Sequence, residues 1–167
     1  DWVQNLSTND ARKARLSEKG IRIIYEDGLL WKNLIDLYGE LPPGASFPFE
    51  TNAAFRARAE QVLKDPSRLL AMWYLADEVG GKNWVPQLQR AGAYFHALDE
   101  DHPTYNLSAG DPDVAPGGDI LAFDCYPRYA GGRRPLVSFA DTMDTMRAVA
   151  GSRKCVIAVP QAFGQKG

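Results

Sequence analysis

The chain has 167 residues, of which 45% are apolar and 24% charged, a composition typical of a globular domain rather than a disordered one. Its net charge of −2, with Arg and Lys scattered along the sequence, gives no electrostatic reason to expect nucleic acid or an anionic membrane as a partner. No apolar run approaches the ~20 residues of a membrane span, and no signal peptide is visible. Because the sequence does not begin with Met, a secreted or periplasmic location stays open.

Helices alternate with strands along most of the sequence. Continuous apolar runs such as LLAMWYL predict strands buried on both faces, whereas apolar residues spaced three and four apart predict helices. Ser7 or Asn9 is expected to cap the first helix, Gly20 to follow it, and Thr51 to cap the clearest helix. In chain order, the predicted elements are helix 7–19, strand 21–25, helix 29–38, helix 51–64, strand 69–75, helix 84–98, strand 104–108, strand 120–126, helix 137–149 and strand 155–162.

This order predicts an α/β fold with a parallel sheet and helices outside it. No Gly-rich phosphate loop follows any strand, which disfavours nucleotide-binding doubly wound folds and leaves a (β/α)8 TIM barrel. A complete barrel needs about 200–250 residues, and only about five strands are visible, with the loop 110–118 in place of one helix. We therefore expect residues 1–167 to form one partial barrel domain, roughly strands three to seven, truncated at both ends.

The two cysteines are predicted not to pair. Cys125 falls near the end of one strand and Cys155 at the start of the next, so parallel strands would separate them by ~15–20 Å. A disulfide needs Cα atoms within roughly 7 Å. Two buried thiols are expected.

Polar residues collect where the predicted strands end. In (β/α)8 barrels this carboxyl-end rim is where active sites are built. The residues concerned are Glu26, Asp27, Asp77, Glu78, Ser108, Asp111, Asp124, Tyr126 and Gln161.

Asp77 and Glu78 are the first candidates for catalysis. A hydrophobic strand that delivers a carboxyl group to a barrel mouth would bury it and raise its pKa, as a general acid requires. The alternative is an ordinary acidic N-terminal region of the following helix, favoured by the helix dipole. The adjacent Trp73 and Tyr74, with the acidic rim elsewhere, favour the functional interpretation.

Asp124 and Tyr126 are the second candidates. They lie two residues apart and so on one face of a strand, where they could bind sugar hydroxyls or orient a second carboxyl group. Asp124 could instead cap the following loop. Glu26 and Asp27 could bind substrate, or could be turn residues beside Gly28.

Other kinds of chemistry find little support. His96 falls in a helix and His102 in a loop, neither at a strand end, so no metal site and no cofactor are expected. The nucleophile motif GxSxG is absent. A lyase or aldolase would need a lysine at a carboxyl end, whereas Lys154 starts a strand. Trp31 and Trp84 could stack on sugars, but such residues more often pack in the core.

Four segments resemble barrel glycoside hydrolases, specifically bacterial proteins related to the clan of retaining enzymes that includes β-galactosidases and cellulases. The segments are Trp73-Tyr74-Leu75-Ala76-Asp77-Glu78, Asp101-His102-Pro103, Phe123-Asp124-Cys125-Tyr126-Pro127 and Val159-Pro160-Gln161-Ala162-Phe163-Gly164. The resemblance covers about 69–164.

The resemblance implies hydrolysis of O-glycosidic bonds in an oligo- or polysaccharide, with Glu78 as acid/base. The clan often has Asn before this Glu and Pro after it, where this chain has Asp77 and Val79. Gln161 stands where the clan carries its nucleophilic Glu, leaving Asp124 as the other well-placed carboxyl group, either a base or a substrate clamp.

A second hypothesis therefore stays open, a non-catalytic glycan-binding or degenerate barrel. Asp77, Tyr126, Glu26, Asp27 and Gln161 would line the substrate site in either case. The exposed edges of an incomplete barrel also predict association of the chain.

Overall fold

The computed structural model describes residues 2–4, 10–26, 48–65, 69–124, 128–129, 132–133 and 137–159. The strands of its main sheet are β1 (Trp2–Gln4), β2 (Arg22–Glu26), β3 (Leu70–Val79), β4 (Thr104–Ser108), β5 (Ile120–Asp124) and β8 (Cys155–Val159). The α-helices are α1 (Asp10–Glu18), α3 (Pro48–Thr51), α4 (Ala53–Leu63), α5 (Val85–Leu98) and α6 (Val137–Ala150). Two 3-10 helices, η1 (Lys82–Trp84) and η2 (Pro112–Gly117), and a small hairpin of β6 (Arg128–Tyr129) and β7 (Gly132–Arg133) complete the described part.

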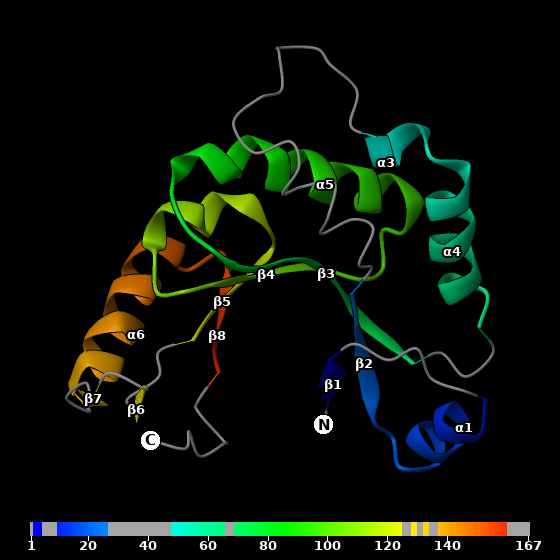
Figure 1. Cartoon of the computed structure of the whole chain (residues 1–167), viewed down its shortest axis with the longest axis horizontal. Helices are drawn as coiled ribbons and strands as arrows, with labels where there is room; N and C mark the ends of the chain where they lie inside the picture. Colours follow the sequence, from blue (N-terminus) through cyan, green and yellow to red (C-terminus); the bar gives the residue numbers. More distant parts are fainter. Residues whose placement is uncertain are drawn as a thin grey trace.

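The main sheet is parallel throughout, with strand order β1-β2-β3-β4-β5-β8. It curves into an arch with α1, α4, α5 and α6 on its outer side (Figure 1). The α/β fold is therefore a half-barrel. All five predicted strands are present, and the three-residue β1 is an additional strand that the sequence pattern did not indicate.

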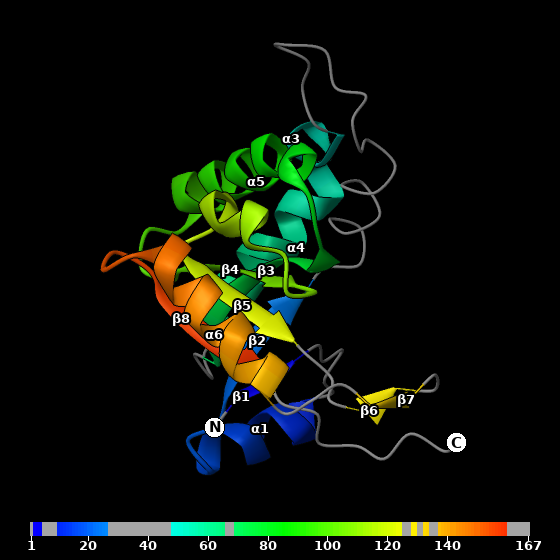
Figure 2. The same ribbon diagram turned by 90° about the vertical axis from the view of Figure 1, so that its left-hand side faces the viewer.

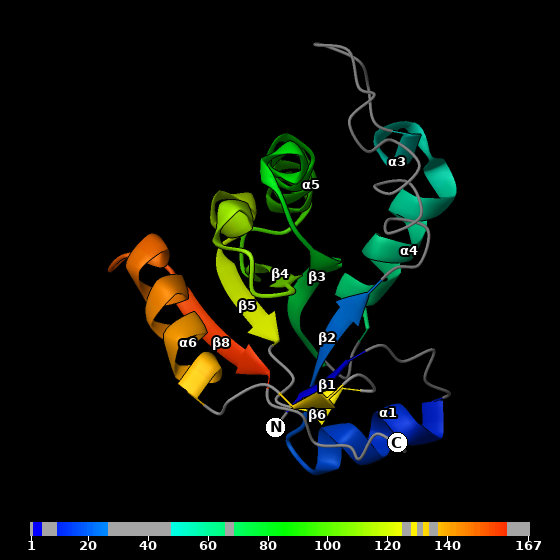
Figure 3. The ribbon, with the colours of Figure 1, turned by 60° about the vertical axis from the view of Figure 1, so that its left-hand side comes forward.

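Helices cover the outside of the arch strand by strand. Turning the molecule shows α6 alongside β5 and β8, and α5 over β3 and β4 (Figure 3). The β6–β7 hairpin lies beyond the carboxyl end of β5 (Figure 2). Because the strands are parallel, their carboxyl ends share one edge of the half-barrel.

The predicted elements agree with the structure with small shifts. The loop 110–118 contains η2 in place of a full helix, and Gly20 takes a left-handed φ of 65° after α1. The N-cap of α4 is Asn52, not Thr51, because the Asn52 side chain accepts hydrogen bonds from the backbone N–H groups of Ala54 and Phe55. The predicted helix 29–38 and the caps Ser7 and Asn9 lie outside the described residues.

The main core lies between the sheet and the helices. Four residues of α5 with helical spacing (88, 91, 92, 95) are buried on one stripe, which presses against the sheet. Phe95 stacks on Trp73 of β3 with ring centroids 4.6 Å apart. Trp84 packs at the margin of this core, as the packing interpretation expects.

A second apolar cluster lies on the concave side of the sheet. Its buried members are Ile24, Met72, Tyr74, Tyr105, Leu107 and Ala122. Ala71, Ile120, Ile157 and Val159 pack against it but are only partly buried. All five residues of β8 are at least partly exposed, so the concave side is most open near β8.

The predicted burial of both cysteines is wrong for Cys155, which is exposed at the start of the strand that ends the sheet. β8 is the edge strand of the sheet among the described residues, and all five of its residues are at least partly exposed. Cys125 lies outside the described residues. Within the described part of the chain, no helix is long and apolar enough to cross a membrane.

Candidate functional site

The carboxyl end of β3 contains a β-bulge at Asp77 and Glu78. Ala76 pairs with Asn106 and Val79 pairs with Ser108, so two residues of β3 stand opposite the single residue Leu107 of β4. Leu107 belongs to the concave cluster. Bulges re-aim side chains and are common next to active sites.

Glu78 has an unusual backbone conformation at this bulge. Its φ of 48° lies in the left-handed region, and it is the one non-glycine residue with positive φ among the described residues. That region costs a non-glycine residue roughly 1–2 kcal/mol, and such strain gathers at functional sites. The Glu78 side chain is exposed, so the expectation that burial raises its pKa is wrong. The core continues past it, since Val79 is buried, and the bulge turns the Glu78 side chain away from that core.

Asp77 is held by a tyrosine of the same strand. The Tyr74 hydroxyl donates a hydrogen bond to Asp77 Oδ1 over 2.5 Å. The Tyr74 ring lies against Tyr105 of β4, with centroids 5.0 Å apart. Trp73, by contrast, faces the helices and donates from Nε1 to Asp99, so only Tyr74 of this pair belongs to the rim.

Tyr105 and Asp124 extend the polar group across the next two strands. Burial, followed by the negative charges of Asp77 and Asp124, raises the pKa of Tyr105 far above its ordinary value, so the phenol stays protonated and can donate a hydrogen bond. Asp124, at the end of β5, is only 4% exposed. Its Oδ2 has no hydrogen-bond partner within the described part of the chain. A buried carboxylate oxygen without a partner is costly, which suits an atom that a ligand would engage.

Ser108 and Asp111 have structural roles at the same edge. Ser108 Oγ donates to the Asp111 carbonyl, and Asp111 Oδ1 accepts from the backbone N–H of Asp113 at the start of η2. Asp111 Oδ2 accepts from the backbone N–H of Gly81 over 2.7 Å, which ties the loop after β4 to the loop after β3.

The side chains of four predicted site residues lie outside the described part of the chain. Glu26 ends β2, where its backbone pairs with Tyr74, but its side chain is outside the description. Asp27, Tyr126 and Gln161 lie outside the described residues altogether.

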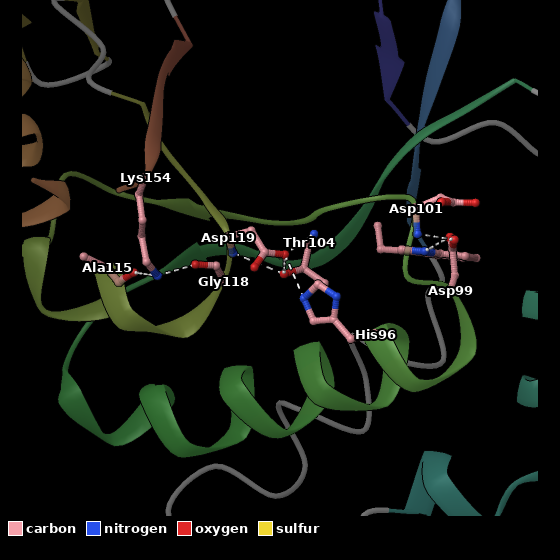
Figure 4. Close-up of polar contacts among 9 residues, drawn as sticks. His96, Asp99, Asp101, Thr104, Ala115, Gly118, Asp119 and Lys154 are labelled. Carbon is pink, nitrogen blue, oxygen red and sulfur yellow. Dashed lines mark hydrogen bonds and ion pairs between the residues drawn. The ribbon is translucent and has the colours of Figure 1, made fainter. Parts of the chain in front are cut away.

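A separate polar cluster occupies the opposite, amino-terminal end of the sheet. Asp119 Oδ2 accepts hydrogen bonds from the backbone N–H and the hydroxyl of Thr104, at 2.7 and 2.6 Å, and lies 3.0 Å from His96 Nε2 (Figure 4). Burial raises the pKa of Asp119, but the Thr104 hydrogen bonds and His96 outweigh it, so the net shift is downward.

The remaining histidine and Lys154 are also at this end. His102 Nδ1 lies 2.9 Å from Asp99 Oδ2. Lys154 Nζ donates to the carbonyls of Ala115 and Gly118 (Figure 4). Burial lowers the pKa of Lys154, and the negative charge of Asp119 opposes this shift. The amine lies at the end of the sheet opposite the carboxyl-end rim, and its hydrogen bonds to the two carbonyls give it a structural role. No group of His, Cys, Asp and Glu among the described residues could hold a metal ion.

The sequence pattern does not single out Tyr74 and Tyr105 as members of this polar group. Tyr74 lies in a continuous apolar run and Tyr105 in a short strand that is buried throughout, so neither pattern reveals which way the side chain points. The available signal was the phenol itself, since a buried Tyr hydroxyl usually needs a polar partner.

Comparisons with known proteins support the fold. The structure is similar to part of the crystal structure of a "putative beta-galactosidase" from Bacteroides fragilis, with a TM-score of 0.56 and 15% sequence identity. The match covers 93% of this chain and 22% of that protein, so this chain spans about a fifth of its length. No protein-family model and no curated protein sequence matches the chain. At this identity the similarity shows a common barrel-like fold.

Proposed function

We propose that the protein is a glycoside hydrolase that acts on O-glycosidic bonds of an oligo- or polysaccharide, with Glu78 as its general acid/base. The observation that carries the proposal is the bulge at the carboxyl end of β3, which places Asp77 and a strained, exposed Glu78 at the edge where barrel enzymes build active sites. Asp124 ends a nearby strand of the same edge.

Glu78 would give its proton to the glycosidic oxygen as the bond to the sugar breaks. A second carboxylate would then act as nucleophile, about 5–5.5 Å away, or as base for a water, roughly 6.5–9.5 Å away. Glu78 stands opposite Leu107, which pairs with Ala122, so Asp124 is two strands across and two residues further along. With strands about 4.8 Å apart and residues about 3.3 Å apart, the backbone separation is roughly 12 Å. If Asp124 is the second carboxylate, this wide backbone spacing fits the longer carboxyl separation of the water-activating, inverting arrangement better than the short one of the retaining arrangement.

The other rim residues would bind the substrate. Asp77, fixed by Tyr74, and the protonated Tyr105 supply an acceptor and a donor for sugar hydroxyls. We propose the same role for Glu26, Asp27, Tyr126 and Gln161 on their sequence positions alone. β-Galactosides are the first substrates to test, because the structural neighbour carries that name.

The test is hydrolysis of 4-nitrophenyl β-D-galactoside, glucoside, mannoside and xyloside by the wild-type protein and by Glu78→Gln. Glu100→Gln is the matched control, since Glu100 is an exposed carboxyl group at the amino-terminal end of the sheet. Activity that Glu78→Gln loses and Glu100→Gln keeps supports the proposal. Equal activity in all three proteins would show that Glu78 has no part in the chemistry.

A non-catalytic glycan-binding barrel is the second candidate, favoured by Gln161 at the position where the related clan carries its nucleophile. Binding of a glycan without turnover of any glycoside in the panel would favour it over the hydrolase.

A further inference from the structure

The regular alternation of side chains between the two faces of the sheet is interrupted twice along β3. Its pairing with β4 shifts between Tyr74 and Ala76, and again between Ala76 and Val79. In a regular strand, residues three apart face opposite sides of the sheet. Here Tyr74 and Asp77 are three apart and yet joined by a hydrogen bond, so the irregular pairing brings both side chains to one side.

Tyr74 is well suited to fix this arrangement. Its side chain is 2% exposed and its ring packs against Tyr105, so the position of its hydroxyl is set by the core of the concave cluster. The hydroxyl reaches Asp77, the residue that immediately precedes Glu78. A rigid core residue thus restrains the chain on the amino-terminal side of the strained position.

A second restraint acts on the other side of Glu78. The backbone N–H of Gly81 donates to Asp111 Oδ2, and Asp111 itself is fixed at the start of η2 through Asp113. Glu78, with its φ of 48°, therefore lies between two hydrogen-bonded anchors, one before it and one after it. An unfavourable backbone conformation persists only where the surrounding structure enforces it.

We infer that Tyr74 is a positioning residue that, through Asp77 and together with the Asp111–Gly81 contact, holds Glu78 in its left-handed conformation and so presents its carboxyl group at the rim. The inference rests on the proposed function of Glu78 as general acid. Tyr74 does not touch the reacting atoms in this account; it acts through the backbone of the bulge.

The kinetic test compares wild type, Tyr74→Phe and the control Tyr94→Phe, which removes a phenol hydroxyl on the outer helix α5. The substrates are the phenyl and 2,4-dinitrophenyl glycosides of whichever sugar the wild type hydrolyses. A displaced general acid slows the phenyl glycoside, whose leaving group needs a proton, more than the dinitrophenyl glycoside. We expect Tyr74→Phe to lower kcat on the phenyl glycoside roughly tenfold or more with little change in KM. Tyr94→Phe should behave as wild type. An equal loss on both substrates, or no loss, would overturn the inference.

A second readout does not depend on turnover. Amide hydrogen exchange at residues 77–81 should accelerate roughly tenfold in Tyr74→Phe, the effect of losing one hydrogen bond to a carboxylate, and should not change in Tyr94→Phe. If no glycoside is hydrolysed but this acceleration occurs, the proposed function fails while the anchoring of the bulge stands. If glycosides are hydrolysed but exchange and leaving-group dependence match wild type, the positioning role of Tyr74 is refuted.

Discussion

Replacing Asp119 with alanine should destabilise the half-barrel, because buried Thr104 loses the acceptor of two hydrogen bonds. One Asp119 oxygen accepts from both the backbone N–H and the hydroxyl of Thr104, which is 1% exposed at the start of β4. In Asp119→Ala the buried N–H loses its acceptor, which costs about 1–3 kcal/mol, and the hydroxyl bond adds about 1 kcal/mol. The expected loss of unfolding free energy is therefore roughly 2–4 kcal/mol.

Urea and thermal unfolding of the 167-residue chain, at matched protein concentration, measure this loss. For a domain of this size 1 kcal/mol lowers Tm by roughly 2–4 °C, so a decrease of roughly 4–16 °C is expected. Asp101→Ala is the control, because Asp101 is an exposed carboxylate in the neighbouring loop. An unfolding free energy of Asp119→Ala within about 0.5 kcal/mol of that control would show that Asp119 does not stabilise Thr104 in this way, since ordinary surface substitutions fall in this range.

Four further outcomes are expected. The pKa of Asp119 is lower in the folded protein than in the unfolded chain. Asp119 therefore stabilises the fold fully at pH values well above its unfolded pKa of about 3.9, and this stabilisation is lost as the pH falls through the lower folded pKa. The stability of Asp119→Asn should decline less steeply than that of wild type below about pH 4, as measured by acid unfolding. Gly117→Ala should lower the free energy of unfolding, measured in urea, by about 1–3 kcal/mol, because the new Cβ would lie 2.7 Å from Leu88 Cβ. Gly92→Ala is the control: its Cβ would have no contact under 3.7 Å, so the substitution should be neutral or stabilising. Asn52→Ala should lower the stability of the chain by about 1 kcal/mol through loss of the α4 cap, and an unchanged melt would contradict that role. The sheet edges at β1 and β8 predict association in light scattering; a monomer with a sharp cooperative melt would count against this.

The order of elements could be predicted from the sequence because parallel strands covered on both faces are continuously apolar. The apolar run 69–75 predicts a buried strand, and the apolar residues of α5 at helical spacing predict a helix. The structure has both elements. The three-residue β1 carries too short a pattern to stand out. The cap of α4 was misplaced by one residue because Thr51 and Asn52 are both good capping residues, and only the side-chain geometry selects Asn52.

The edge of the candidate site could be predicted, but its geometry could not. Carboxyl groups at strand ends point to the rim of a barrel, and Asp77, Glu78 and Asp124 do end β3 and β5. The bulge that re-aims Asp77 and strains Glu78 depends on how β3 pairs with β4. Pairing register is a property of two strands, and no pattern within one strand reveals it.

The leaving-group dependence of hydrolysis tests the central claim most directly. Phenyl and 2,4-dinitrophenyl β-glycosides differ in how much they need a proton on the departing oxygen, which is the step assigned to Glu78. We predict that Glu78→Gln lowers the rate of hydrolysis of the phenyl glycoside far more than that of the dinitrophenyl glycoside. Glu100→Gln should hydrolyse both substrates at the wild-type rates. If Glu78→Gln leaves the ratio of the two rates unchanged, Glu78 is not the general acid and the account of this site is wrong.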